Sequence, residues 1–286
     1  MNRKTRPDPE PPVRPSASFV ARRALAVAAL ALAGLGCGLA DISFLNRTDS
    51  READPDLAAD TGVAQGDPQS LLEQGIAAYR NADFVAAKSL LDRAIALEPE
   101  DAEGYYYRGR TSYKLGDLEQ ALADFDTAIT LAPQHAGAHY YRGRVFYRAG
   151  RHEEAVEALG QAVVLDPQNA QAYLYLGRAL YRLERYEVAA ESETQAIALQ
   201  PDLADAYYYR GRAYYKLGRY YEAAAEMDQV IRLNPEHAGA YYYRARSYAK
   251  VDAISRAVED LQRALTLTIS DNMRLRAEAL LDELQP

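Results

Sequence analysis

The sequence predicts an all-α fold: an α-solenoid of six 34-residue helix-turn-helix repeats and a C-terminal capping helix, preceded by an N-terminal signal or membrane-anchor segment. One observation is a hexapeptide of tyrosine and arginine, YYYRGR at residues 105–110 and 207–212, which has close variants elsewhere in the chain. A second is a set of prolines that recur every 34 residues, at Pro99, Pro133, Pro167, Pro201 and Pro235. Because proline cannot continue a helix, each one is expected to end the second helix of a repeat.

The N-terminal element is a basic flank followed by an apolar run. Residues 1–23 are basic and proline-rich, with a net charge of +4, and residues 24–40 carry no charge. This order is typical of a secretion signal or a membrane anchor. By the positive-inside rule, we expect residues 1–23 in the cytosol and the repeats on the extracytoplasmic (periplasmic) side, membrane-anchored or secreted. Three fates of residues 24–40 stay open: cleavage, retention as an anchor, or lipidation at Cys37.

Cys37 is the one cysteine of the chain, so no internal disulfide can form. Its place resembles that of a lipoprotein cysteine: Gly36 is the small residue just before it, but Gly34 stands where an aliphatic residue is usual. Residues 41–67 are polar, acidic and aperiodic, which predicts a flexible linker. The chain has a net charge of −8, so the residues beyond 40 carry −12, and such an acidic body disfavours nonspecific binding to nucleic acid.

The repeats occupy residues 68–272, divided as 68–101, 102–135, 136–169, 170–203, 204–237 and 238–272. Position 8, counted from the first residue of each repeat, is glycine in five repeats and Ala245 in the sixth. A small residue there lets the two helices approach closely, and an added methylene would cost about 1–3 kcal/mol by overpacking. In the sixth repeat Ile269 replaces the closing proline, and residues 273–286 are predicted to form the capping helix.

The period, the small residues and the closing prolines together resemble the tetratricopeptide repeat (TPR) family. The resemblance covers residues 68–272. It implies a solenoid in which the first helices of successive repeats line a concave groove, and a non-enzymatic scaffold that binds other proteins. Combined with the N-terminal segment, it suggests an exported or membrane-anchored, bacterial-type TPR protein.

Positions 7 and 23 predict ion pairs between the two helices of a repeat. An arginine and an acid occupy them together in the second, fifth and sixth repeats: Arg108 with Asp124, Arg210 with Glu226, and Arg244 with Asp260. In the third repeat Arg142 has no acid at position 23, although Glu157 is adjacent to that position. We interpret these arginines as interhelix salt bridges, with ligand binding as the alternative.

Positions 5, 9 and 12 form a stripe that we expect to face away from the core of the repeat, with position 13 beside it. Position 9 is arginine in five repeats, positions 5 and 12 are mostly tyrosine, and position 13 is basic. The family resemblance implies that this face lines the concave groove. The predicted groove residues are Tyr106, Arg110, Tyr113, Lys114, Tyr140, Arg144, Tyr147, Arg148, Arg178, Tyr181, Arg182, Tyr208, Arg212, Tyr215, Lys216, Tyr242 and Arg246.

Such a groove suits an acidic or extended segment of another protein of the cell envelope. Arginine binds carboxylates bidentately, and tyrosine supplies rigid amphipathic area. Three alternatives stay open: the arginines pack on tyrosine rings and bind nothing, the groove binds single-stranded nucleic acid, or the solenoid is a structural spacer or self-assembly unit. The family's lysine/asparagine clamp for chaperone C-termini is not supported, because tyrosine and arginine occupy those places.

The sequence shows no catalytic constellation. The four histidines, His135, His139, His152 and His237, do not pair at metal-ligand spacing, and no phosphate loop or nucleophile elbow occurs. We therefore expect no enzyme, no cofactor and no metal. Nucleic acid and small molecules are not expected as partners, and contact with a membrane is expected only through residues 24–40.

Overall fold

The computed structural model describes residues 66–285, and all regular structure in this part of the chain is α-helical. The predictions for residues 1–65, which include the apolar run at 24–40, Cys37 and nearly all of the linker, lie outside the described residues. Among the described helices, none combines the length and the apolar character that crossing a membrane requires.

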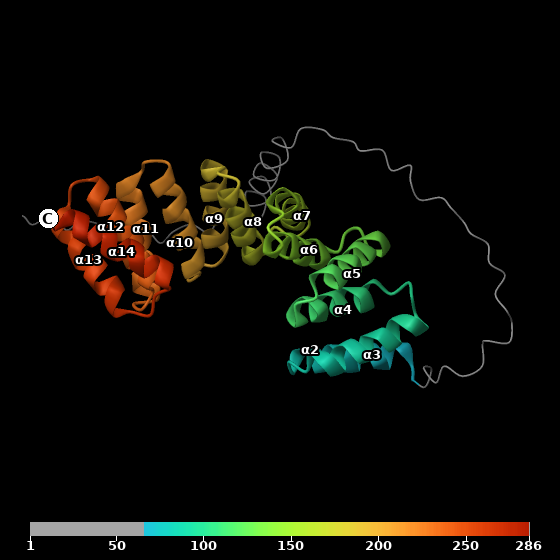
Figure 1. Ribbon diagram of the computed structural model, residues 1–286. Coiled ribbons are helices and arrows are strands. Elements are labelled where there is room, and N and C mark those ends of the chain that lie inside the picture. Colours follow the sequence, from blue (N-terminus) through green and yellow to red (C-terminus); the bar gives the residue numbers. More distant parts are fainter. Residues whose placement is uncertain (1–65, 286) are drawn as a thin grey trace, which may run out of the picture.

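The predicted all-α solenoid is confirmed: six helix pairs stack in chain order, from α2 at one end to α14 at the other (Figure 1). The pairs are α2 (Pro68–Arg80) with α3 (Phe84–Leu97), α4 (Ala102–Leu115) with α5 (Leu118–Leu131), α6 (Ala136–Arg148) with α7 (His152–Leu165), α8 (Ala170–Arg182) with α9 (Tyr186–Leu199), α10 (Ala204–Lys216) with α11 (Tyr220–Leu233), and α12 (Ala238–Lys250) with α13 (Ile254–Thr266). Each pair packs on the next, so the first helices of neighbouring repeats come into contact and build one continuous surface.

The two helices of each repeat approach closely at one contact, between positions 24 and 8, which we call the steric lock. In the first five repeats the side chain at position 24 of the second helix packs against the glycine at position 8 of the first, and in the sixth Leu261 and Ala245 belong to the same buried cluster. These position-24 side chains are 0% exposed, and they are Leu91, Phe125, Leu159, Glu193, Met227 and Leu261. A Cβ atom added to Gly143 would lie only 2.5 Å from Leu159 Cγ, so glycine is required for this close approach. Five of the six locks are apolar, and the fourth contains a carboxyl group.

The turn between the two helices has the same conformation in every repeat. Position 15 has a positive φ, between 59° and 89°, in all six: Ala82, Gly116, Gly150, Glu184, Gly218 and Asp252. Glycine adopts this left-handed conformation without steric cost, whereas a side chain makes it unfavourable by about 1–2 kcal/mol. Three repeats therefore keep a strained residue in the turn, because the tertiary packing of the helix pair fixes its path.

Polar side chains define where the first helices begin. Asp67 and Asp101 accept hydrogen bonds from amides in the first turns of α2 and α4. His135 and His237 do the same at the starts of α6 and α12, where each Nδ1 accepts from an amide three residues later. The histidines of the inter-repeat turns thus have a structural role as N-caps.

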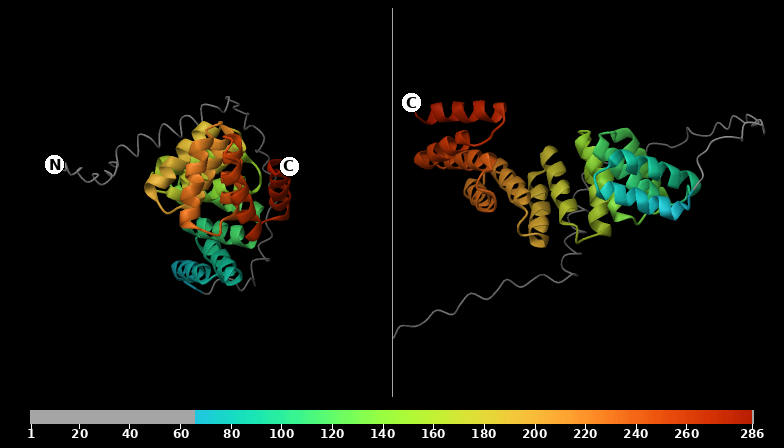
Figure 2. Two further views of the ribbon diagram at one scale, coloured as in Figure 1. Left: turned by 90° about the vertical axis from the view of Figure 1, so that its left-hand side faces the viewer. Right: turned by 90° about the horizontal axis from the view of Figure 1, so that it is seen from below.

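The last repeat is covered by α14 (Asp271–Leu284), which starts two residues before the predicted boundary at 273. Its Ala277 is fully buried, and Leu280, Leu281 and Leu284 pack against the cluster formed by α12 and α13. Figure 2 shows α14 as the outermost helix at the C-terminal end of the stack. A terminal helix of this kind shields the apolar face that a following repeat would otherwise cover.

The strained turn gives a first prediction. Glu184→Gly should raise the free energy of unfolding by about 0.5–1 kcal/mol, because glycine adopts the left-handed conformation without a steric cost. Chemical denaturation followed by circular dichroism measures the change. Glu191→Gly, in the exposed interior of α9, is the control and should lower stability by about 1 kcal/mol. A loss of stability in both variants would contradict the strained-turn interpretation.

Candidate functional site

Arginines at position 7 lie between helices, and the predicted ion pairs within repeats are confirmed. Arg108 Nη2 lies 2.7 Å from Asp124 Oδ1, and the Arg108 Nε also donates to this carboxylate. The other two predicted pairs form at 2.8 Å for Arg210 with Glu226 and at 2.6 Å for Arg244 with Asp260. The acid at position 23 is largely buried in each case, so the pair is well shielded from water.

The same arginines also reach back to position 25 of the preceding repeat, a contact that sequence reasoning missed. Arg108 Nη1 lies 2.9 Å from Asp92 in this way. In the third repeat Arg142 pairs with Asp126 of the second repeat at 3.1 Å, and not with the adjacent Glu157. Position 7 therefore joins successive repeats as well as the helices of one repeat.

Arginines at position 9 have an entirely different environment of tyrosine rings. The guanidinium carbon of Arg110 lies 4.6 Å from the ring centre of Tyr79, 5.2 Å from Tyr106, 5.0 Å from Tyr107 and 4.9 Å from Tyr141. These rings come from position 12 of the preceding repeat, positions 5 and 6 of the same repeat, and position 6 of the next. Each distance lies within the range of a cation–π interaction.

This arrangement recurs at every position-9 arginine, and we call it the tyrosine–arginine ladder. Its arginines are Arg110, Arg144, Arg178, Arg212 and Arg246, and its tyrosines are those that surround them at positions 5, 6 and 12. Arg144 and Arg212 have four rings, as Arg110 does. Arg178 has three, because Leu174 replaces tyrosine at position 5.

The tyrosines at position 6 are functional candidates that the sequence-based stripe left out. They are Tyr107, Tyr141, Tyr175, Tyr209 and Tyr243. Each of the last four contacts the position-9 arginine of its own repeat and that of the repeat before it. Their recurrence as the third tyrosine of the hexapeptide, three residues before the arginine, was the available signal.

The tyrosines at position 5 are less accessible than predicted. Tyr140 is 8% exposed and Tyr242 is 6% exposed, so both are walls of the ladder and not open contact area. The rings pack edge to face with position 6 of the next repeat, as Tyr140 does with Tyr175 at 6.1 Å between ring centres. Burial raises the pKa of Tyr106 to about 12 and raises that of Tyr140 as well, which keeps these phenols neutral at physiological pH.

The ladder arginines lack a direct ion pair in the part of the chain that the structure describes. Among residues 66–285, none of the five forms an ion pair, and the buried Nε atoms of Arg110, Arg144, Arg178 and Arg212 have no hydrogen-bond partner. Burial would lower the pKa of Arg144, but the surrounding phenols, with Tyr140 first, raise it overall. The guanidinium groups stay charged, and the rings hold them in place.

Positions 12 and 13 flank the ladder. Tyr113, Tyr147, Tyr181 and Tyr215 are half-buried, and each packs on the arginine of the next repeat. The basic residues of position 13 are exposed: Lys114, Arg148, Arg182 and Lys216. Arg148 donates from Nη1 to the carbonyl oxygen of Tyr113, 3.2 Å away, and so caps the C-terminal end of α4.

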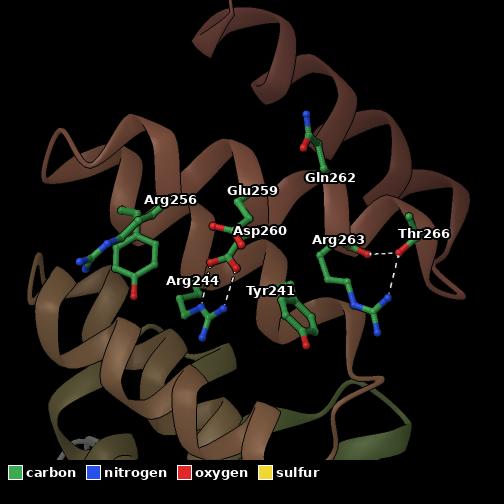
Figure 3. A pocket seen from close by; sticks show the side chains of 9 residues that line it. Tyr241, Arg244, Arg256, Glu259, Asp260, Gln262, Arg263 and Thr266 are labelled. Carbon is green, nitrogen blue, oxygen red and sulfur yellow. Dashed lines mark hydrogen bonds and ion pairs between the residues drawn. The ribbon is translucent and has the colours of Figure 1, made fainter.

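One cavity in this part of the molecule is separate from the ladder. A cavity of about 680 Å³ lies between α12 and α13, where Tyr241 and Arg244 of α12 line it together with Arg256 and Arg263 of α13 (Figure 3). Arg244 is bound to Asp260 within it, so the positive charge there is already balanced. None of the predicted groove residues lines this cavity. No metal-binding cluster of histidine, cysteine and acidic side chains occurs in residues 66–285.

Sequence comparison assigns the chain to a family. Tetratricopeptide repeat profiles match residues 72–136, 109–170 and 140–204, and a further one matches 204–237. Together the matches cover more than half of the chain, and the protein therefore belongs to the tetratricopeptide repeat family. A comparison with curated proteins found no significant match.

Solved structures of several TPR proteins are similar to this chain. YrrB, described as "a TPR protein with an unusual peptide-binding site", is 26% identical, with a TM-score of 0.59 over 66% of this chain and 97% of that one. MamA (41-end) from Desulfovibrio magneticus RS-1 is 26% identical, with a TM-score of 0.55 over 61% and 99%. PilF of Pseudomonas aeruginosa, at 16% identity and a TM-score of 0.65 over 74% and 96%, shares the fold.

The position-7 ion pairs give a second prediction. Arg108→Met should lower the free energy of unfolding by about 3–5 kcal/mol, because it leaves a buried carboxylate without a counter-ion. The Asp124 side chain is only 2% exposed. Arg142→Met is the matched control: Asp126 is 52% exposed, so water replaces the lost partner and the cost should be about 0–1 kcal/mol. Urea denaturation compares the two, and equal losses would refute this account of the pairs.

Proposed function

We propose that this protein is a scaffold that binds an acidic, extended segment of another protein along the tyrosine–arginine ladder. The observation that carries the proposal is the difference between two rows of arginine. Arginines at position 7 form ion pairs with carboxylates of their own chain, whereas those at position 9 form no direct ion pair among the described residues. In a chain with a net charge of −8, a row of unbalanced cations favours an external anion.

The packing of the ladder supports binding rather than competing with it. Pure cation–π packing is the alternative role for such arginines, and that packing is present, but it leaves the guanidinium groups without an ion pair among the described residues. Rings on several sides fix each guanidinium before a ligand arrives, so less side-chain entropy is lost on binding. One cation in each of five successive repeats suits a chain that runs along the solenoid with acidic groups at intervals.

The comparisons support the same class of ligand. TPR proteins bind other proteins, and the description of YrrB refers to a peptide-binding site in that protein. Single-stranded nucleic acid is the competing ligand, because stacked rings and guanidinium groups also suit bases and phosphates. We favour the peptide because the proposed export of the protein would separate the ladder from the nucleic acids of the cytosol.

For the location of the protein, we propose that residues 24–40 direct it to the membrane and that the ladder faces the extracytoplasmic side. The charge order of residues 1–40 supports this placement. Mass spectrometry of the mature protein extracted from membranes would identify its N-terminus and any lipid on Cys37. A soluble protein with an intact N-terminus in the cytosol would overturn the proposal.

Neutralising two ladder arginines gives a third prediction. The double variant Arg144→Gln/Arg212→Gln should bind an oligo-glutamate peptide on the order of 100-fold more weakly, because hydrogen bonds to charged groups contribute about 1.5–3 kcal/mol each. Fluorescence anisotropy with a labelled peptide measures the change, and circular dichroism checks the fold.

The matched control removes the same charge from the N-cap positions of two second helices. Arg151 and Arg219 are exposed and each pairs with a glutamate three residues later, so Arg151→Gln/Arg219→Gln should bind nearly as the wild type does. Equal losses in both double variants would show that only overall charge matters. Tighter binding of single-stranded RNA than of the peptide, with a steep salt dependence, would favour the nucleic-acid alternative.

A further inference from the structure

The fourth repeat differs from all the others at its steric lock. Position 24 is a leucine, phenylalanine or methionine in the five other repeats, but it is Glu193 here. The Glu193 side chain is 0% exposed, and its Oε1 and Oε2 atoms have no hydrogen-bond partner. It lies directly against Gly177 of α8, where an added Cβ would clash with the carboxyl group. Burying an acid in this way is costly, and a leucine would fill the space at no such cost.

Few charged groups face this carboxyl. α9 packs against α8 and α10, and the charged side chains near Glu193 are Arg178 on α8, and Asp205 and Arg210 on α10. Arg210 is already bound to Glu226 and Thr194, and Asp205 is negative. The phenols of these helices do not titrate near neutral pH, since burial raises the pKa of Tyr173 to about 12 and also raises that of Tyr209.

Of the two cations near Glu193, Arg178 is therefore the one that forms no ion pair among the described residues. It follows Gly177 in α8, and its buried Nε has no hydrogen-bond partner. It is also the ladder arginine that has no tyrosine at position 5 of its own repeat, because Leu174 occupies that position. An unpaired buried acid and an unpaired, partly enclosed guanidinium thus lie on facing helices of the same repeat, and no other ladder arginine has an acid at position 24 of its repeat.

We propose that Glu193 is an internal counter-ion of Arg178, so that an anionic group of the partner binds at the fourth repeat together with one proton. Without a ligand, and at a pH above the pKa of Glu193, the ionised carboxyl offsets the charge of Arg178 without a direct ion pair. When a ligand carboxylate arrives at Arg178, two negative charges would share one cation, and Glu193 takes up a proton instead. The inference rests on the proposed function, because the ladder must bind an acidic segment for the exchange to occur.

The sign of the pH dependence follows from linkage. Burial raises the pKa of Glu193 well above its ordinary value, and the nearby Arg178 partly opposes this shift. A bound anion raises the pKa further, so affinity falls as pH rises between the free and bound values, by at most about tenfold per pH unit. In the free protein, the raised pKa makes folding less favourable as pH rises from the unfolded value of about 4.3 through the folded value.

The experiment compares the full-length wild-type protein, purified in mild detergent, with Glu193→Gln, which keeps the shape of the side chain but cannot ionise. An oligo-glutamate peptide, itself fully ionised above about pH 6, is titrated at several pH values up to about pH 8.5. The wild type should lose affinity as pH rises and should take up a fraction of a proton on binding, measured by calorimetry in buffers of different protonation enthalpy. Glu193→Gln should bind the peptide more tightly than the wild type at the upper end of the range. Its affinity should not change with pH.

Glu191→Gln on the same helix is the charge-matched control, because Glu191 is exposed. It should retain the pH profile and the proton uptake of the wild type. Identical profiles and proton uptake for the wild type and Glu193→Gln would overturn the inference while leaving the proposed function intact.

A measurement without ligand distinguishes a failure of the proposed function from a failure of the counter-ion inference. The thermal unfolding midpoint of the wild type should fall as pH rises relative to that of Glu193→Gln. If the wild type binds no peptide but shows this difference, then the proposed function and the exchange at Arg178 both fail, and only the buried acid itself is verified. Parallel midpoints would show that Glu193 does not titrate over this range, which overturns the counter-ion role.

Discussion

The stacking of first helices is the constraint on which the rest of this structure depends. A helix pair of this length cannot bury its apolar face alone, so each repeat is completed by its neighbours. The contacts that define the ladder all follow from this. Arg110 receives one ring from the first repeat, two from its own and one from the third. The site is therefore a property of the stack, and no single repeat contains it.

Two arginines in one hexapeptide have opposite roles because they lie on different faces of the same helix. Position 7 points between the helix pairs, where acids of its own repeat and of the preceding one neutralise it. Position 9, two residues later and so about 200° around the helix, points to the face lined by tyrosine. The first arginine forms ion pairs within the stack, and the second lies among tyrosine rings without an ion pair in the described part of the chain.

The fourth repeat is where this pattern is relaxed. It lacks the arginine at position 7, where Leu176 is fully buried, and it has Leu174 in place of a ladder tyrosine. It also has the buried Glu193 behind its ladder arginine. The repeat lies in the middle of the stack, within the largest apolar cluster, which extends from Tyr140 to Ala206. Burial of the apolar side chains in that cluster stabilises the fold and offsets the cost of a buried acid at position 24.

The sequence by itself determined the fold class, the repeat length and the ion pairs within repeats. A strict period fixes which residues of successive helices are equivalent, and a small residue or proline has the same steric meaning in each copy. It also placed the position-9 arginines on one stripe. Only the tertiary structure decided what surrounds them. The position-6 tyrosines, the back contact from Arg142 to Asp126 and the burial of Tyr140 depend on the rotation between neighbouring repeats. Periodicity along one chain leaves that rotation undefined, because it is set by side-chain packing between repeats.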